Sequence, residues 1–505
     1  MAAHREDRAT SDHRDRAGND DPARVVDHDR AGSDDRDPSA PGRRDREDRG
    51  TAPDQAVRPG RDVTGRRDRA VRAAVARGLL TEERPVAGLL DTAGIRASAA
   101  ALRAAFAQVT EAPVLHAFAV KACPLVPVLR LLRDAGLGAE VASPGELALA
   151  RAAGVPPALT VLDSPAKTPA ELREALALGI AVNADNPQEL ARLDALMGRA
   201  PGTAPRSPLG LRVNPQIGGG TIDALSTATP TAKFGIALRD EGAREWVVRA
   251  FLDRPWLTRL HLHTGSQGVP LALMATGVRA VYELAEEINR AAGRRQVDTV
   301  DIGGGLPVNF ASDEDTPTHA EYARLLATEA PGLFDGRYRL VTEFGRSLLA
   351  RHGTLLARVE YTKTSGARPI AVTHAGVQVA TRTVYDPASW PLRIRVYDAD
   401  GRPKEGPAVA QDVAGPACFA GDLLAVNRAL PPLEPGDVVA ALDTGAYYFA
   451  HHYGYNSLLR PGVYGYTEDP RDGGAPRFGT VRPPGTVATL VAEAGGDDPG
   501  ALLDG

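Results

Sequence analysis

Between residues 96 and 348, apolar runs of strand length alternate with longer stretches in which apolar residues recur at helical spacing. Proline and small polar residues open several of the helical stretches, and glycine closes several, as is typical of helix ends. Eight runs have strand length: 114–120, 138–143, 159–164, 180–186, 209–215, 258–267, 297–305 and 338–346. This α/β alternation predicts a (β/α)8 TIM barrel, in which functional groups gather at the carboxyl ends of the strands. A doubly wound open sheet is the alternative.

The pattern changes after residue 349. Residues 349–485 carry β-rich runs separated by Gly and Pro turns, which predict a C-terminal β-barrel or sandwich domain. Residues 71–95 form an N-terminal lead-in, and its run PVAGLLD (85–91) is a candidate strand of that domain. Residues 486–505 are expected to be a frayed tail.

Residues 1–70 have a composition of their own. They contain no Leu, Ile, Phe, Tyr or Trp and alternate Arg with Asp. Such a segment cannot bury enough apolar surface to offset its ordering entropy, so we expect a disordered, charged tail.

Charge and cysteine content narrow the classes of function. The net charge of -5 does not favour a nucleic-acid or anionic-membrane partner. The chain has 2 cysteines, too few for a disulfide framework, which indicates a cytoplasmic protein. No apolar run reaches the roughly 18 residues that a membrane helix needs.

Lysine is rare in this chain, and Lys121 stands at the end of the apolar run HAFAV. A lysine in a poorly solvated pocket has a depressed pKa and can act as a Schiff-base amine. The plain alternative is a lysine whose stem packs while its ammonium group reaches solvent.

Three other strand ends carry candidate chemistry. HLHTGSQ places His261 and His263 on one face of a strand, where they could bind a metal or contact a flat cofactor. DIGGGLP follows a strand with three glycines, which suit a phosphate cradle or simply a tight turn. EFGR offers Glu343 and Arg346, either for a pyridine nitrogen and a phosphate or for a local salt bridge.

Taken in order, eight motifs resemble those of the fold-type III pyridoxal-phosphate (PLP) decarboxylases, the family of the diaminopimelate, ornithine and arginine decarboxylases. The motifs are FAVKA, EVASPGEL, STATPTAKFGI, HLHTGSQ, DIGGG, EFGR, GPACFAGD and DTGAY followed by YNS. The resemblance covers about residues 85–465 and is nearest in layout to diaminopimelate decarboxylase. It implies a PLP-dependent carboxy-lyase that releases CO2 from the α-carbon of an amino acid.

The resemblance also implies roles for individual residues. Lys121 would form the internal aldimine, His263 would stack on the pyridine ring, and Glu343 would face the ring nitrogen. Cys418, supplied by the partner chain, would reprotonate the substrate carbon. Glu140 and Glu146 match acidic residues beside the lysine, and Glu140 is included in the cofactor site. The phosphate-binding groups would be Ser266, Gly303, Gly304, Gly305, Arg346 and Tyr447.

The segment after the cysteine departs from the family pattern. Diaminopimelate decarboxylases typically have CESGD, whose glutamate contacts the distal amino group of the substrate, whereas this chain has Phe419. A phenyl ring cannot accept an ammonium group, and an unpaired buried charge costs several kcal/mol. Arg382 matches an arginine used for the distal end of the substrate, so Arg382, Phe419 and Tyr447 are the expected substrate contacts. We therefore expect a divergent decarboxylase of a specialised biosynthetic pathway.

The sequence also leads to expectations about the partners of the protein, and it leaves several alternative functions open. The resemblance implies a homodimer with shared active sites and a small amino-acid substrate, which can be free or carrier-tethered. Cysteine content, charge and hydrophobicity lead us to expect a cytoplasmic protein with no nucleic-acid or membrane partner, and we expect no metal. The alternatives are diaminopimelate decarboxylase of lysine biosynthesis, another PLP enzyme such as a racemase, a non-catalytic regulator with the same fold, and a metal-dependent TIM-barrel hydrolase that uses His261 and His263.

Overall fold

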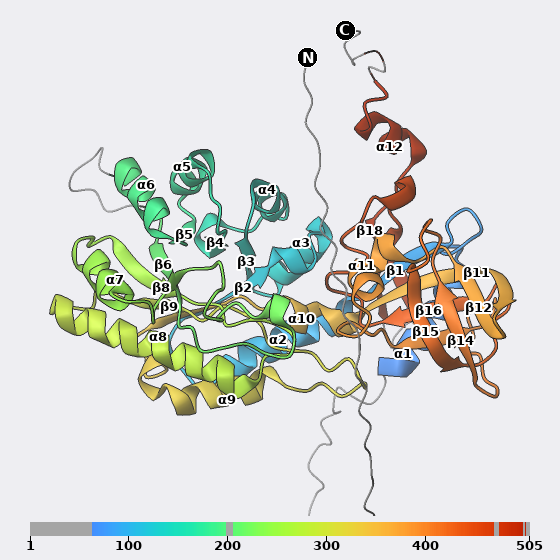
Figure 1. Cartoon of the computed structure of the whole chain (residues 1–505), viewed down its shortest axis with the longest axis horizontal. Helices are drawn as coiled ribbons and strands as arrows, with labels where there is room; N and C mark the ends of the chain where they lie inside the picture. The colour runs from blue at the N-terminus through green and yellow to red at the C-terminus, as the bar shows by residue number, and fades with distance from the viewer. Residues whose placement is uncertain (1–62, 198–205, 469–473, 498–499, 501–505) are drawn as a thin grey trace, which may run out of the picture. The chain divides into compact units, whose positions relative to one another are not determined.

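The computed structural model describes residues 63–197, 206–468, 474–497 and 500. The expected disorder of residues 1–62 therefore concerns a part of the chain outside the described residues. Figure 1 shows the described elements, with the barrel on the left and the second sheet on the right.

Eight parallel strands form a closed barrel. β5 pairs with both β4 and β6, and β10 pairs with both β9 and β2, so the ring of strands closes. The predicted TIM barrel is confirmed, and the open-sheet alternative is wrong. The barrel strands are β2 (Val114–Ala119), β3 (Gly138–Val141), β4 (Thr160–Leu162), β5 (Ala181–Ala184), β6 (Leu209–Asn214), β8 (Leu257–His261), β9 (Thr299–Asp301) and β10 (Arg339–Thr342), with the short β7 (Ile236–Ala237) beside β6.

Helices connect the barrel strands, and local sequence fixes several of their ends. α5 begins with a capping box formed by Thr168 and Glu171, has Pro169 in its first turn, and ends at Gly179 with φ 76°. α9 begins with a second capping box. The helices are α2 (Thr92–Ala107), α3 (Val126–Asp134), α4 (Pro144–Ala152), α5 (Pro169–Leu178), α6 (Pro187–Met197), α7 (Ala243–Leu252), α8 (Leu271–Ala292), α9 (His319–Glu329) and α10 (Arg346–Leu349).

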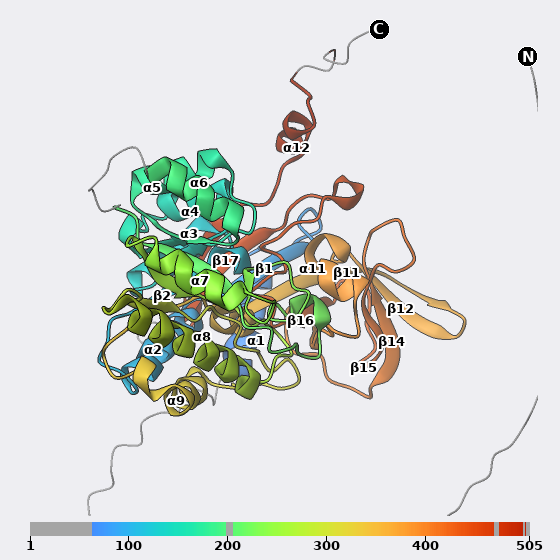
Figure 2. The same cartoon turned by 60° about the vertical axis from the view of Figure 1, so that its left-hand side comes forward.

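The second sheet contains one strand that precedes the barrel in the chain and several strands that follow it. β1 (Val86–Asp91) pairs antiparallel with β11 and parallel with β17, so the lead-in contributes a strand to the C-terminal domain. Figures 1 and 2 both show β12, β14 and β15 side by side, away from α8 and α9. The other elements are β11 (Gly353–Ser365), β12 (Arg368–Thr373), α11 (Val377–Tyr385), β13 (Ile394–Tyr397), β14 (Val409–Ala414), β15 (Leu423–Leu430), β16 (Val438–Leu442), β17 (Gly462–Glu468) and β18 (Pro476–Arg482).

Two helices lie where tails were expected. α1 (Val63–Ala76) takes in residues 63–70, and α12 (Val487–Glu493) lies within 486–505. In α1, a stripe of small apolar residues, Ala70, Val71 and Ala74, is buried against the second sheet. The expectation of disorder relied on the absence of large apolar residues, whereas alanine and valine suffice for this packing.

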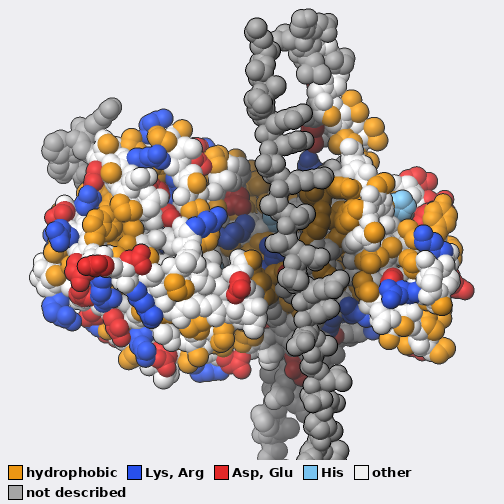
Figure 3. Space-filling model, viewed as in Figure 1, with side chains coloured by type: hydrophobic (Ala, Val, Ile, Leu, Met, Phe, Trp, Pro, Cys, Tyr) orange, Lys and Arg blue, Asp and Glu red, His pale blue; other side chains and the backbone are white. Residues whose placement is uncertain are grey.

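The surface agrees with the modest net charge. Lys and Arg side chains are interspersed with Asp and Glu over the barrel face shown in Figure 3. Among the described residues, none of the helices combines the length and hydrophobicity needed to cross a membrane.

Candidate active site

A cavity of about 240 Å³ lies at the carboxyl ends of the barrel strands. It brings together residues at or just after the ends of β2, β8, β9 and β10, and from the segment after β6, with residues from the second domain. Eight of the predicted site residues line it: Lys121, His263, Ser266, Gly305, Glu343, Arg346, Arg382 and Tyr447.

Lys121 lies in a single 3-10 turn, Val120–Ala122, directly after β2. Its Nζ forms an ion pair with Glu140, which is buried on the neighbouring strand β3. The turn is tied to the second domain, because the Lys121 carbonyl lies 2.6 Å from His451 Nε2 and the Ala122 carbonyl accepts the Tyr447 N–H at 2.9 Å. Burial alone would lower the pKa of Lys121, but the charges of Glu140 and Glu343 raise it above the ordinary value. The depressed pKa expected from the sequence is therefore wrong, because Lys121 is paired with a buried carboxylate.

His263 presents an uncharged ring to the cavity. Burial, with the charges of Arg212 and Lys121, lowers the pKa of His263 to about 3. Its Nδ1 accepts the backbone N–H of Gly304 at 3.2 Å, which fixes the orientation of the ring. A neutral imidazole held in this way suits contact with a flat aromatic ligand.

The glycines of DIGGG allow three backbone segments to meet. A Cβ on Gly305, which has φ 96°, would lie 1.8 Å from the carbonyl oxygen of Gly265. A Cβ on Gly304 would lie 2.1 Å from the carbonyl oxygen of Glu343, and one on Gly303 would lie 2.5 Å from that of Leu262. Side chains are therefore excluded here, and backbone groups line this side of the cavity.

Two guanidinium groups share two aromatic rings at the cavity. Arg346 and Arg382 lie over the Tyr447 ring at 4.6 and 4.3 Å, and over the Trp390 ring at 4.7 and 5.0 Å. Within the described part of the chain, Arg346 Nε and Nη1 and Arg382 Nη1 are buried without a hydrogen-bond partner. Burial, and then the charge of Arg382, lowers the pKa of Arg346 to about 10. Buried guanidinium groups with unused N–H donors are suited to a phosphate or carboxylate, so the residues present fit the phosphate of PLP.

Cys418 and Phe419 do not line this cavity in the single chain. Cys418 is exposed, and its backbone N–H donates to Asn456 Oδ1 at 2.8 Å. Asp422 accepts the backbone N–H groups of Ala417 at 2.7 Å and Val377 at 2.6 Å, which holds the same loop from the other side.

Phe419 belongs to a group of aromatic side chains beside this cysteine. Its ring stacks on Tyr385 at 5.9 Å with an interplanar angle of 8°, and meets Tyr455 edge-on at 5.4 Å. Glu146 has a local role: it accepts the Ala142 N–H at 2.7 Å, while its own N–H donates to the Ser143 side chain at the start of α4.

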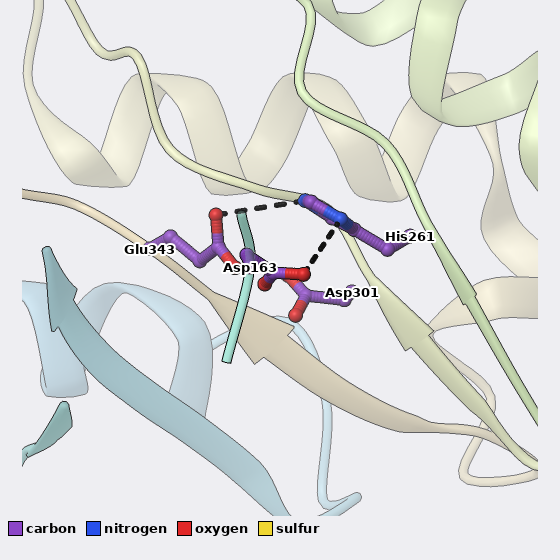
Figure 4. A group of neighbouring side chains, drawn as sticks. All are labelled: Asp163, His261, Asp301 and Glu343. Atoms are coloured by element: carbon purple, nitrogen blue, oxygen red, sulfur yellow. Dashed lines mark ion pairs between the residues drawn. The ribbon is translucent and has the colours of Figure 1, made fainter. Parts of the chain in front are cut away.

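His261 lies in a buried cluster with three acidic residues, one of which is Glu343 of the cavity lining. Figure 4 shows the four side chains of this cluster. Asp163, His261, Asp301 and Glu343 lie at the carboxyl ends of β4, β8, β9 and β10, and each is buried. His261 Nδ1 lies 3.3 Å from Asp163 Oδ1, and His261 Nε2 lies 3.6 Å from Glu343 Oε2. His261 and His263 thus have different surroundings, although both approach Glu343.

Sequence reasoning missed Trp390, Asn456, Asp422, Asp163 and Asp301. Asp163 and Asp301 had a usable signal, because each is a carboxylate at the carboxyl end of a predicted barrel strand. Trp390 lies in an irregular segment, and its partners come from other elements, so no local pattern identifies it.

The fold and the cavity define a barrel protein with a lysine and an anion site at its strand ends. The sequence model of the family "Pyridoxal-dependent decarboxylase, pyridoxal binding domain" matches residues 93–350. The chain belongs to this family, which confirms the expected PLP-dependent decarboxylase and disfavours the metal-dependent hydrolase.

Individual relatives agree with this assignment. A diaminopimelate decarboxylase of Pseudomonas aeruginosa is 34% identical over 350 residues, which are 69% of this chain and 80% of the relative. One of Actinosynnema pretiosum is 34% identical over 387 residues, 75% of this chain and 83% of the relative. The structure of diaminopimelate decarboxylase from Helicobacter pylori complexed with L-lysine has a TM-score of 0.71 at 25% identity, covering 82% of this chain and 97% of that one.

Proposed function

We propose that the cavity holds PLP, that Lys121 is the amine bonded to its aldehyde carbon, and that the protein releases CO2 from the α-carbon of an amino acid. One observation carries the proposal: the only lysine in the cavity lining shares that lining with Glu343, an uncharged His263 and two guanidinium groups that have buried, unused N–H donors. An amine, a carboxylate, a flat neutral ring and an anion site match the four parts of PLP that a protein has to hold. Bound PLP supplies the electron sink for the bond to carbon dioxide.

Each side chain contributes a specific interaction in this proposal. Arg346 and the backbone around Gly305 hold the phosphate, and His263 contacts one face of the ring. Glu343 lies at the ring nitrogen, where an ionised carboxylate keeps that nitrogen protonated. Glu140 orients the Lys121 amine, and its carboxylate balances the positive charge of Lys121 as long as the amine is protonated.

We propose that Cys418 of a second copy completes the site as the proton donor to the substrate carbon. Cys418 is exposed and held by Asn456, which supports a role toward a group outside its own chain. Random pairing of Lys121→Ala and Cys418→Ala chains gives half heterodimers, each with one intact site, so about a quarter of wild-type activity should return. Lack of recovery on mixing and subunit exchange would place Cys418 outside the shared site.

The substrate proposed here carries a distal anionic or uncharged group. Arg382 has an unused, buried N–H for a distal carboxylate, and the aromatic ring of Phe419 has no negative charge to pair with a distal ammonium. Diaminopimelate decarboxylase is the second candidate, because several relatives carry that name. Phe419→Glu separates the two: if the proposal holds, it should raise kcat/KM on meso-diaminopimelate by about tenfold or more, the scale of one charged hydrogen bond. A wild-type protein that already prefers meso-diaminopimelate would favour the second candidate.

We place the protein in the cytoplasm, where its free thiols, Cys123 and Cys418, would stay reduced. The substrate can be free or tethered to a carrier protein, and a panel of both forms distinguishes these.

Borohydride labelling tests the cofactor proposal directly. We expect a yellow absorption band that bleaches on reduction, with the pyridoxyl group mapped to Lys121 by mass spectrometry. Lys121→Ala should lose the label, whereas Lys363→Ala, on an exposed part of β11, should keep it. A labelled holoenzyme is then screened for CO2 release with acidic, apolar and diamino acids. Absence of any label after incubation with PLP would count against the proposal and favour the non-catalytic regulator.

A further inference from the structure

Four buried side chains, His261 among them, form one cluster behind the cavity. Three are carboxylic acids and one is an imidazole, and all four lie in the interior of the barrel. Ionised carboxylates in such a place need a compensating cation, because burial penalises unpaired charge strongly. Burial alone would lower the pKa of His261, yet Asp163 and Glu343 raise it to about 10. His261 is therefore charged at neutral pH.

The geometry identifies what the imidazole contacts. Its two nitrogens face two different carboxylates, Nδ1 toward Asp163 and Nε2 toward Glu343 (Figure 4). A metal ion at this place can bond one of these nitrogens and several of the carboxylates at once. An imidazolium pairs with Asp163 and Glu343 through its own charge and directs one N–H toward each acid. At 3.3 and 3.6 Å these contacts are ion pairs rather than hydrogen bonds, so the charge of the ring is what the two acids share.

We propose that His261 is a positioning residue that acts through Glu343: held as an imidazolium between Asp163 and Glu343, it keeps the Glu343 carboxylate ionised and oriented toward the cofactor nitrogen. This inference rests on the proposed PLP site. Burial and the charge of Asp163 raise the pKa of Glu343 to about 7, while the charge of His261 lowers it. Without His261, Glu343 would take up a proton at physiological pH and could no longer stabilise a protonated pyridine nitrogen.

Other charged groups act on the same cluster and are the same in every variant below. Arg259 on β8 acts on Asp301, and Lys167 acts on Asp163 from the loop after β4. On the cavity side, Lys121 is paired with Glu140, and His263 is neutral. Asn183 Nδ2 donates to Asp163 Oδ2 at 3.2 Å, which holds that carboxylate in place.

The test measures PLP affinity by absorbance titration between about pH 6 and pH 9 in three variants, His261→Gln, Asp163→Asn and the double variant. His261→Gln should bind PLP about ten- to a hundredfold more weakly near pH 6.5, the range for a hydrogen bond to a charged group. The deficit should shrink toward pH 9, where Glu343 ionises without help. The double variant should recover part of the loss, because the neighbouring charge of Asp163 is removed as well.

Asp163→Asn provides an independent result if His261→Gln does not fold. Removing the Asp163 charge takes away the main support of the His261 imidazolium, so this variant should also bind PLP more weakly than the wild type near pH 6.5. The loss should be smaller than in His261→Gln, because the repulsion between Asp163 and Glu343 is removed as well. Equal pH profiles in wild type, His261→Gln and Asp163→Asn would overturn the inference. Stoichiometric metal in the purified wild type, whose removal by a chelator changes PLP affinity, would overturn it too. A wild type that takes up no PLP would instead count against the proposed function.

Discussion

The side-chain oxygen of Asn456 accepts a 2.8 Å hydrogen bond from the backbone N–H of Cys418. The two residues are 38 positions apart in the chain. Asp422 accepts two more N–H groups, from Ala417 and Val377, and so ties the cysteine loop to the start of α11. Together they hold an exposed thiol at a fixed place on the surface of its own chain.

Asn456→Ala should therefore slow the reaction without emptying the cofactor site. Loss of one hydrogen bond of about 1 kcal/mol lets the loop move, and we expect kcat to fall about fivefold. PLP content, read from absorbance, should not change. Asn186→Ala is the matched control, because Asn186 accepts the Glu189 N–H at 3.0 Å at the start of a barrel helix. It should reduce stability but leave kcat near wild type, and equal losses of kcat in both would contradict this role of Asn456.

Arg346 and Arg382 should differ in what they bind, although they share two rings. Arg346→Gln should weaken PLP binding by about tenfold or more, since a charged hydrogen bond to the phosphate is lost. Arg382→Gln should keep PLP and raise KM for the amino acid. Because the two cations lie close together, neither change should lower the thermal stability of the cofactor-free protein. A loss of PLP in Arg382→Gln would show that both guanidinium groups bind phosphate.

The sequence predicts the barrel well, because strand and helix periodicity are local properties and the strand ends carry the lysine, histidine and carboxylate of the site. Lys121, His263 and Glu343 were found for that reason. Asn456 lies in the quoted YNS motif but received no role, because its partner Cys418 is 38 positions away. Trp390 was missed because it lies in an irregular segment without a motif. α1 was missed because alanine and valine pack there without a large apolar residue. The charge state of Lys121 depends on Glu140 on the neighbouring strand. A prediction from burial alone therefore gives the wrong direction for the pKa of Lys121.

Lys167 lies in SPAKTP, a turn-like segment, yet its side chain is fully buried and pairs with Glu189 at 2.7 Å. Glu189→Gln keeps the shape but leaves a buried ammonium group unpaired, and we expect it to cost about 3 kcal/mol in the free energy of unfolding. The control is Glu287→Gln, which breaks a pair of the same 2.7 Å length that is more than a third exposed on both sides. That change should cost less than about 1 kcal/mol. Chemical denaturation measures both, and equal costs would mean that burial does not decide the strength of the pair.

Acid should destabilise the fold through histidines that are buried in the neutral form. Burial lowers the pKa of His116 and His319 to about 4, and of His263 and His352 to about 3. In the unfolded chain these groups titrate near 6.5. Between pH 6.5 and pH 4 the unfolded state therefore binds more protons, so stability that is fully present above pH 6.5 falls as the pH drops. Glu343, whose pKa is raised to about 7, works in the opposite direction over part of this range.

His319→Gln isolates one of these contributions in the cofactor-free protein. His319 Nε2 lies 3.1 Å from the Ser347 hydroxyl, a contact that a glutamine amide can keep. Removing its titration should flatten the fall in unfolding free energy by up to about 1.4 kcal/mol per pH unit near pH 5, the value for one proton. Ser347→Ala, which removes the contact but keeps the buried histidine, is the control and should leave the slope as in the wild type. Urea denaturation from pH 4 to pH 7 gives the slopes, and an unchanged slope in His319→Gln would mean that His319 is protonated in the folded protein.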